Sequence, residues 1–294
     1  MVNRRDFLKQ ASLLVAGGVI SGRILSSCSG GAKNVAKKHI GLQLYSLRGD
    51  ISGDVGIRKI LEIVAEMGYV NLETAGYNDG TLYGIAPAEF KKIVDDLGMK
   101  VTSSHLGRFP SDNHDEDMAW WNKATEAHAT AGMKYMIMPF SPLSNEGATL
   151  DNVKKYGDYF NEIGLITAAS SIAFGYHNHA FEFENKIDDV AVYDLLIENT
   201  SPRHVFFQND VYWTTEGGSC PVEYLKKYPD RIKTLHIKDD RDIGGSGKMD
   251  FEAIFNQAYE NGIKDWYVEM EDERTPQEDV KKSYDFLAAA DYVI

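Results

Sequence analysis

From residue 39 onward, short apolar runs alternate with longer stretches whose apolar positions recur at helical spacing. The short runs are rich in Val, Ile and aromatic residues, which is typical of buried strands. Predicted strands cover residues 39–45, 70–74, 100–105, 135–138, 172–177, 204–209, 232–237 and 266–270. Each strand precedes a predicted helix, and these helices cover about 57–67, 87–97, 115–131, 150–169, 190–198, 221–228, 251–260 and 276–290.

Strict alternation of strands and helices predicts a parallel sheet, because parallel neighbours need a crossover connection. Eight such units within residues 39–294 predict one closed (β/α)8 TIM barrel in the α/β class. A doubly wound open sheet is the alternative. It is disfavoured because no glycine-rich dinucleotide fingerprint follows the first strand.

The first 30 residues predict an export signal and lipid anchor. A segment with two arginines, residues 3–9, resembles the twin-arginine motif, and the apolar residues 11–20 after it are too short to span a bilayer. Leu25-Ser26-Ser27-Cys28 then resembles a bacterial lipoprotein cleavage site, with Cys28 as the lipidated residue. The alternative is a disordered basic N-terminus.

This interpretation divides the chain into a signal and anchor (1–30), a flexible tether (31–38) and the barrel (39–294). We therefore expect an exported bacterial lipoprotein, in the periplasm or anchored at the outer membrane. The lipid anchor would be its contact with the membrane, because we identify no transmembrane helix in the mature sequence.

Charge and cysteine content narrow the possible functions. The 294 residues carry a formal net charge of −13, which repels nucleic-acid phosphates, so we expect no nucleic-acid partner.

The two cysteines are Cys28 and Cys220. If Cys28 is lipidated, no intrachain disulfide forms, and we expect Cys220 to be packed in the protein rather than reactive.

Polar residues gather where the predicted strands end, which in such barrels is the face that carries the active site. Asp210, His236 and Glu269 follow one another on strands six, seven and eight. Two carboxylates and an imidazole on neighbouring strands predict a divalent metal site. Separate salt bridges at the loops are the alternative. The ligand types suit Mn, Zn, Co or Mg.

Four segments carry a family resemblance: residues 174–183, 208–213, 235–239 and 267–269. They resemble the xylose-isomerase-like superfamily of sugar phosphate isomerases and epimerases. The resemblance implies a metal held by Glu, Asp, His and Glu on strands five to eight. Asp210, His236 and Glu269 match the last three positions.

The first ligand position departs from the family pattern. Where many members have Glu-Asn-His, this chain has His177-Asn178-His179. Either His177 or the nearby Glu182 could complete the metal site. A small sugar is the implied substrate, and the same two residues are the candidates for a catalytic partner to Glu269.

Further residues are predicted to bind the substrate. Glu73 and His105 stand where the family often binds sugar hydroxyls, and His105 could instead be a wall residue. Lys238 lies two residues after His236, so both can face one side of a strand, although it could also be a solvated loop lysine. The remaining candidates, each with a packing or supporting role as the alternative, are His179, Trp213 and Tyr45. The glycine-rich residues 244–248 lack phosphate-loop spacing, so we interpret them as an ordinary loop.

The predicted chemistry is proton abstraction next to a carbonyl, with a metal-stabilised enediolate. Glu269 is the first candidate for acid–base catalysis. The result would be isomerisation or epimerisation of a sugar or keto-sugar, or, as an alternative, elimination by a lyase or dehydratase. Export favours an unphosphorylated sugar, keto-sugar or glycoside. A DNA-repair endonuclease is disfavoured by the charge, and a non-catalytic lipid-anchored sugar-binding protein is a further alternative.

Overall fold

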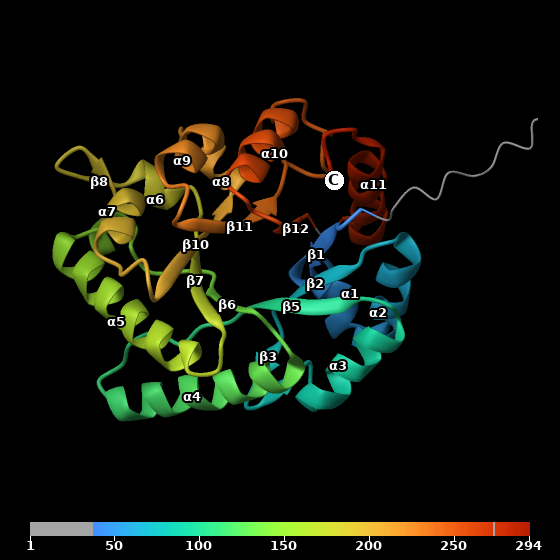
Figure 1. Ribbon diagram of the computed structural model, residues 1–294, viewed down its shortest axis with the longest axis horizontal. Helices are drawn as coiled ribbons and strands as arrows, with labels where there is room; N and C mark the ends of the chain where they lie inside the picture. The colour runs from blue at the N-terminus through green and yellow to red at the C-terminus, as the bar shows by residue number, and fades with distance from the viewer. Residues whose placement is uncertain (1–37, 273) are drawn as a thin grey trace, which may run out of the picture. The chain divides into compact units, whose positions relative to one another are not determined.

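Eight parallel strands close into a barrel in the computed structural model, which describes residues 38–272 and 274–294 (Figure 1). The predicted (β/α)8 fold is confirmed. Around the barrel the order is β1, β2, β5, β6, β7, β10, β11, β12 and back to β1. These strands cover Gly41–Gln43, Asn71–Thr74, Lys100–His105, Tyr135–Met138, Ala173–His177, Val205–Asp210, Ile232–Ile237 and Asp265–Val268, respectively. The predicted signal, Cys28 and nearly all of the tether lie outside the described residues.

A layer of helices surrounds the barrel, with one long crossover helix between most neighbouring strands (Figure 1). These helices are α2 (Gly56–Met67), α3 (Pro87–Asp96), α4 (His114–Ala131), α5 (Leu150–Ala168), α7 (Val192–Glu198), α9 (Pro221–Lys227), α10 (Phe251–Glu260) and α11 (Pro276–Ala289). Gly68 and Gly132 cap α2 and α4 with φ values of 112° and 79°, a conformation that glycine adopts without strain.

Short additional elements all follow the carboxyl ends of strands, so they surround one mouth of the barrel. They are the 3-10 helices η2 (Leu44–Leu47) and η3 (Asn145–Gly147), the helices α1 (Arg48–Ser52), α6 (Phe181–Glu184) and α8 (Val211–Glu216), and the hairpins β3 (Tyr77–Asn78) with β4 (Thr81–Leu82) and β8 (Lys186–Ile187) with β9 (Val190–Ala191). The sequence pattern did not predict these elements. The first strand was predicted to reach Tyr45, but it ends at Gln43, whose side chain accepts a hydrogen bond from the Tyr45 amide.

Strand register brings polar side chains from distant sequence positions to the same level of the barrel. Gln43 lies opposite Glu73, Glu73 opposite Ser103, and Asp210 opposite His236. Register shifts after Leu72 and Phe207 accompany two of these alignments. Because side chains alternate between the two faces of a strand, each of these polar groups depends on its register.

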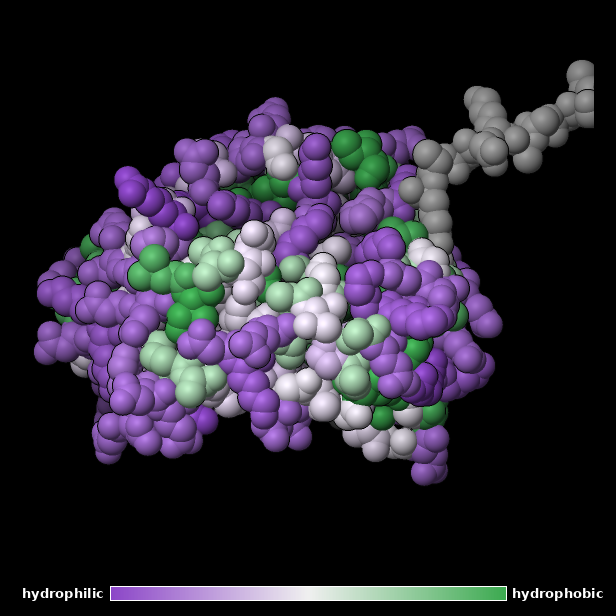
Figure 2. Space-filling model, turned by 60° about the horizontal axis from the view of Figure 1, so that its bottom comes forward, coloured by the Kyte–Doolittle hydropathy of each residue, from purple (hydrophilic) through white to green (hydrophobic). Residues whose placement is uncertain are grey.

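The core between barrel and helices combines many aliphatic side chains with large buried aromatic ones. Trp121 on α4 packs edge-to-face on Phe174 of β7, and its indole N–H donates to the Tyr159 hydroxyl at 2.8 Å. The face in Figure 2 is mainly hydrophilic, with several separate, smaller hydrophobic patches. Among the described helices, none has the length and apolar character needed to cross a bilayer.

Helix α5 approaches the loop before β10 so closely that Gly164 has no room for a side chain. A Cβ there would lie 2.2 Å from the backbone oxygen of His204. We expect Gly164→Ala to destabilise the fold by roughly 1–3 kcal/mol, although alanine is the better helix former by about 1 kcal/mol. Urea unfolding measures the change.

Leu165→Ala is the control for this prediction, because Leu165 is the next residue and is 57% exposed. Its substitution should change stability by less than about 0.5 kcal/mol. A Gly164→Ala protein as stable as the parent would contradict the close approach of helix and loop.

Candidate active site

The mouth of the barrel holds a cavity of about 640 Å³ at the carboxyl ends of the strands. Its polar lining includes Arg48 and five residues that end strands or closely follow them: His105, His177, His179, Glu269 and Glu271. Four of the predicted site residues are in this set. Cavities of this size enclose small-molecule ligands.

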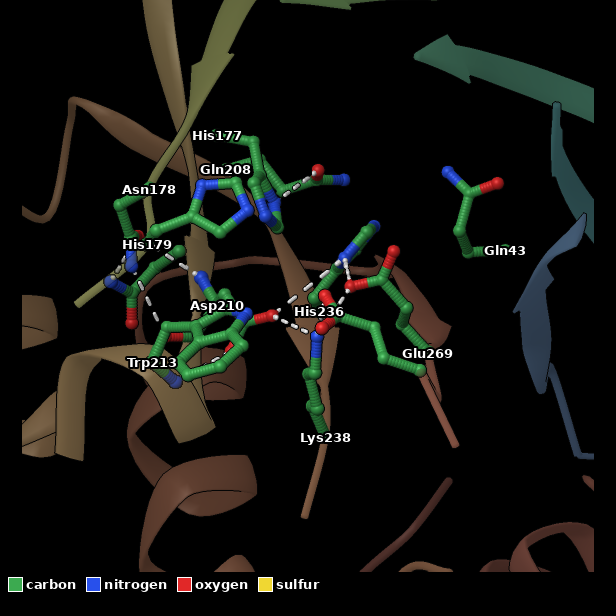
Figure 3. Close-up of polar contacts among 12 residues, drawn as sticks. Gln43, His177, Asn178, His179, Gln208, Asp210, Trp213, His236, Lys238 and Glu269 are labelled. Atoms are coloured by element: carbon green, nitrogen blue, oxygen red, sulfur yellow. Dashed lines mark hydrogen bonds and ion pairs between the residues drawn. The ribbon is translucent and has the colours of Figure 1, made fainter. Parts of the chain in front are cut away.

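Four side chains from four neighbouring strands converge near the floor of this cavity. His177, Asp210, His236 and Glu269 each offer one ligand atom, and these atoms all lie within 4.8 Å of one another (Figure 3). The first three lie on β7, β10 and β11, and Glu269 directly follows β12. All four are buried. The structure therefore brings together the predicted trio and His177 as the fourth member.

His236 lies between two carboxylates. Its Nε2 is 2.5 Å from Glu73 Oε1, and its Nδ1 is 3.0 Å from Glu269 Oε2. Burial alone would lower the pKa of His236, but the negative charges of Glu269 and Glu73 outweigh it and raise that pKa to about 10. With one ring nitrogen held by Glu73, the other is directed at Glu269 and Asp210.

Asp210 carries an unsatisfied buried oxygen. Its Oδ1 accepts a hydrogen bond from the Trp213 amide at 2.8 Å and thereby caps helix α8. Its Oδ2 has no hydrogen-bond partner and lies 3.9 Å from both His236 Nδ1 and Lys238 Nζ. Burial raises the pKa of Asp210 to about 7, although the Lys238 charge opposes that shift. A bound cation would satisfy this oxygen, so the donor set fits a metal.

Glu73 lies among the barrel's inner side chains, and its predicted contact with substrate is wrong. The side chain is fully buried, and its Oε1 accepts from Gln43 at 2.8 Å and pairs with His236. Its Oε2 accepts from Ser103 at 2.5 Å and from Gln208 at 3.0 Å. With both oxygens engaged, this carboxylate orients His236 rather than a sugar hydroxyl.

Two further histidines share one glutamine. Gln208 Oε1 lies 2.7 Å from His105 Nε2 and 3.1 Å from His177 Nδ1. Burial lowers the pKa of both imidazoles, so they are uncharged at neutral pH. Gln208 was not identified from the sequence, although it lies two residues before Asp210 and therefore on the same face of β10.

Glu182 is not part of this cluster. Its Oε1 accepts from the Tyr176 hydroxyl at 2.5 Å, and its Oε2 accepts from the His179 amide at 2.8 Å. Tyr176 precedes His177, so its side chain leaves the opposite face of β7 and stacks on Phe160 of helix α5. The predicted alternative of Glu182 as metal ligand or catalytic group is therefore wrong, because its carboxylate is held behind the strand.

Lys238 is buried and paired with carboxylates, so the alternative of a solvated lysine is wrong. Its ammonium group lies 3.1 Å from Glu269 Oε2 and 2.5 Å from Glu271 Oε1. It also lies 4.8 Å from the ring centroid of Trp213. Burial would lower the pKa of Lys238, but the carboxylates, Glu269 first, raise it above its usual value. Glu271 was not among the site residues predicted from the sequence.

The other predicted contacts divide into two groups. His179 and Tyr45 line the cavity, and the buried Nδ1 of His179 has no hydrogen-bond partner. Burial lowers the pKa of His179 to about 4. Trp213 is not among the cavity-lining residues. It packs beneath the Lys238 ammonium group, so it supports the site rather than stacking on a substrate.

Two predictions outside the cavity have different outcomes. Cys220 was expected to be packed, but it is exposed at the N-cap of α9, because the chain turns at the surface before Pro221. The glycine-rich loop is structural, as expected. Its Gly244 and Ser246 amides donate to Asp239 Oδ2 at 3.1 and 3.3 Å.

The chain is similar in sequence to a known protein family and, in sequence and fold, to solved structures. Residues 61–290 match the family described as xylose isomerase-like TIM barrel. A crystal structure of a sugar phosphate isomerase/epimerase from Parabacteroides distasonis is 40% identical with a TM-score of 0.79, and the match covers 87% of this chain and all of that one.

More distant similarities agree on the fold. An inosose dehydratase from Geobacillus kaustophilus is 25% identical over 256 residues, which cover 74% of this chain and 80% of that protein. The 3-keto-D-glucoside 4-epimerase of E. coli is 20% identical with a TM-score of 0.64 over 86% of this chain and the whole of that chain, so it shares the fold.

The buried Glu182 carboxylate gives a pH-dependent prediction. Burial raises its pKa to about 8 from an ordinary 4.5, so the folded state binds a proton that the unfolded state releases between these values. Binding of this proton stabilises the folded parent protein at low pH, and that stabilisation is lost as the pH rises from 4.5 to 8. Glu182→Gln should be more stable than the parent at pH 8, by more than about 1 kcal/mol, and should differ less at pH 5.

Urea unfolding of both proteins at the two pH values measures the difference. An equal stability difference at pH 5 and pH 8 would contradict the protonation of Glu182.

Proposed function

The chain belongs to the xylose isomerase-like TIM-barrel family, and we propose that it is a sugar-modifying enzyme that binds a divalent metal ion and abstracts a proton next to a carbonyl. One observation carries this proposal: the buried cluster of His177, Asp210, His236 and Glu269 beside the cavity, with Asp210 Oδ2 unsatisfied. Such a cluster is costly to bury unless a cation or a ligand engages it.

The four cluster residues are the proposed metal ligands. Two carboxylates and two imidazoles suit Mn, Zn, Co or Mg, and an ion bound there would supply a Lewis acid for a carbonyl and a neighbouring hydroxyl. His177 replaces the carboxylate that many relatives carry, so this chain would hold the ion with one negative charge fewer. Glu73 fixes the His236 ring for this role.

Glu269 is the proposed base. It lines the cavity, and although burial raises its pKa, Lys238 and His236 hold that pKa well below its usual range, so the carboxylate is ionised. It takes a proton from the carbon beside the carbonyl. The electron pair of the broken C–H bond forms the C=C bond of the enediolate, and the carbonyl oxygen gains the negative charge.

Completion of the reaction needs a stabilising charge and a proton donor. The Lys238 ammonium group, 3.1 Å from Glu269, stabilises the developing negative charge. Return of a proton to the neighbouring carbon gives an isomer, and return to the opposite face of the same carbon gives an epimer. His177 is the proposed partner for proton return because it lines the same cavity.

Dehydration is a second candidate function. It is favoured by the inosose dehydratase relative and by the imidazole at the His177 position. In this case the same proton abstraction is followed by cleavage of a C–O bond on the next carbon. The electron pair leaves with the hydroxyl group, which receives the proton that Glu269 abstracted and is released as water.

Asp210→Asn tests the metal site. We expect the variant to lose bound metal, measured by elemental analysis, and to lose at least about 100-fold of its activity, because the unsatisfied carboxylate oxygen becomes an amide nitrogen that cannot ligate. Deuterium exchange from D₂O into keto-sugars and keto-glycosides reports the proton abstraction. A new C=C bond in the product would identify the dehydratase outcome.

The matched control is Glu182→Gln, which also replaces a buried carboxyl group with an amide but lies outside the cluster. It should retain both metal and exchange activity. Unchanged metal content in Asp210→Asn would overturn the site assignment.

We also propose that the chain is exported and lipid-anchored through Cys28. The basic, apolar and cysteine segments in that order support this. In a bacterial host the parent should incorporate fatty acid and partition into detergent, whereas Cys28→Ser should do neither. Equal partitioning of the two proteins would contradict the anchor.

A further inference from the structure

The cavity wall has two chemically different halves. The metal-ligand cluster extends around the barrel from β7 to β12. The residues that line the cavity along this part of the barrel are polar. The loops after β1, β2, β5 and β6, together with helix α4, supply a mainly apolar half, which includes Tyr45, Tyr77, Leu106, Trp120, Pro139 and Phe140. We call this set the apolar half. Its position beside the cluster means that one ligand can touch both halves.

Large aromatic groups in the apolar half are exposed to solvent. Phe140 is 42% exposed and Tyr45 is 43% exposed. Phe140 contacts the 47% exposed Phe109 at a ring-centroid distance of 6.2 Å, and Trp120 packs edge-on against Tyr77 at 5.4 Å. Exposed apolar groups at a cavity mouth, rimmed by polar residues, are typical of binding surfaces.

Cavity size supports a ligand larger than one sugar ring. Cavities of roughly 300–1,000 Å³ enclose drug-sized molecules, and this one is about 640 Å³. A single ring placed over the metal-ligand cluster leaves the apolar half uncovered. A second ring attached to the first would cover it.

Charge in the cavity disfavours a phosphorylated substrate. Glu269 and Glu271 place two carboxylates in its lining. Arg48 is the arginine among the described lining residues, and its guanidinium donates to the backbone oxygens of Tyr45 and Glu271. A phosphate dianion would thus meet two carboxylates here, and a single arginine that already donates hydrogen bonds to the backbone.

We propose that the substrate is an uncharged glycoside whose sugar ring lies over the metal-ligand cluster and whose aglycone, a second ring, packs on the apolar half at Phe140 and Trp120. This inference rests on the proposed function and specifies its substrate class. Aromatic faces pack well on sugar and phenyl rings, and such contacts contribute roughly 0.5–1.5 kcal/mol beyond the buried area.

Phe140→Ala tests the inference, because it removes a partly exposed aromatic ring of the apolar half. The probes are the 3-keto forms of methyl β-D-glucoside, phenyl β-D-glucoside and glucose 6-phosphate, each with the metal-loaded protein. We expect the phenyl probe to have a kcat/KM about 10-fold above that of the methyl probe, and the phosphate to react most slowly. Phe140→Ala should lower kcat/KM by about 5- to 10-fold for the phenyl probe and by less than about 2-fold for the methyl probe.

Phe286→Ala is the matched control. Phe286 is 41% exposed on helix α11 and is not among the residues that line the cavity. It should leave both kcat/KM values unchanged. Saturation-transfer NMR gives a binding readout independent of turnover, and the phenyl protons should receive strong transfer in the parent and weak transfer in Phe140→Ala.

The outcomes separate the two proposals. Equal kcat/KM for the methyl and phenyl probes, or equal effects of Phe140→Ala on both, would overturn the aglycone site while the proposed function stands. A kcat/KM for the phosphate probe above those of the two glucoside probes would also overturn the proposal of an uncharged substrate. If the parent reacts with none of the probes but its NMR transfer to the phenyl ring depends on Phe140, the proposed chemistry fails and the binding site is retained.

Discussion

The burial of ionisable groups at the barrel mouth is the constraint on which the site depends. Asp210 and Glu269 lose hydration there, as does Glu73 beneath them, and each loss disfavours a negative charge. His236 and Lys238 compensate Glu269 with short ion pairs. Asp210 is compensated less completely, since both cationic groups lie 3.9 Å from its Oδ2. Because the charge of Asp210 is incompletely compensated, a bound cation would stabilise this buried carboxylate.

The barrel makes this arrangement precise because its strands are short, paired on both sides and locked by the helices outside. Asp210 and His236 are register partners on adjacent strands. Glu73 reaches His236 from the far side of the barrel interior, across 163 residues of sequence. Rigid strands therefore position the ligands, while the surrounding loops and short helices shape the space above them.

Local sequence patterns predicted the strands, the long helices and the polar strand ends, because short apolar runs and the helical spacing of apolar positions are local properties. The roles of Glu73 and Glu182 could not be predicted in this way. Glu73 acquires His236 and Gln208 as partners only when the barrel closes and brings β10 and β11 across from β2. Glu182 is directed by the turn after β7, which leads it to Tyr176 rather than to the cluster. Cys220 illustrates the same limit, since its exposure is set by a turn.

The two halves of the cavity wall come from two successive parts of the chain. The apolar half is built from residues 45–140, whereas the cluster is built from residues 177–269. Evolution can therefore alter one half by substitutions in the early loops without disturbing the geometry of the ligands. On one inherited reaction centre, a lineage could diversify the partner attached to the sugar and keep the chemistry unchanged.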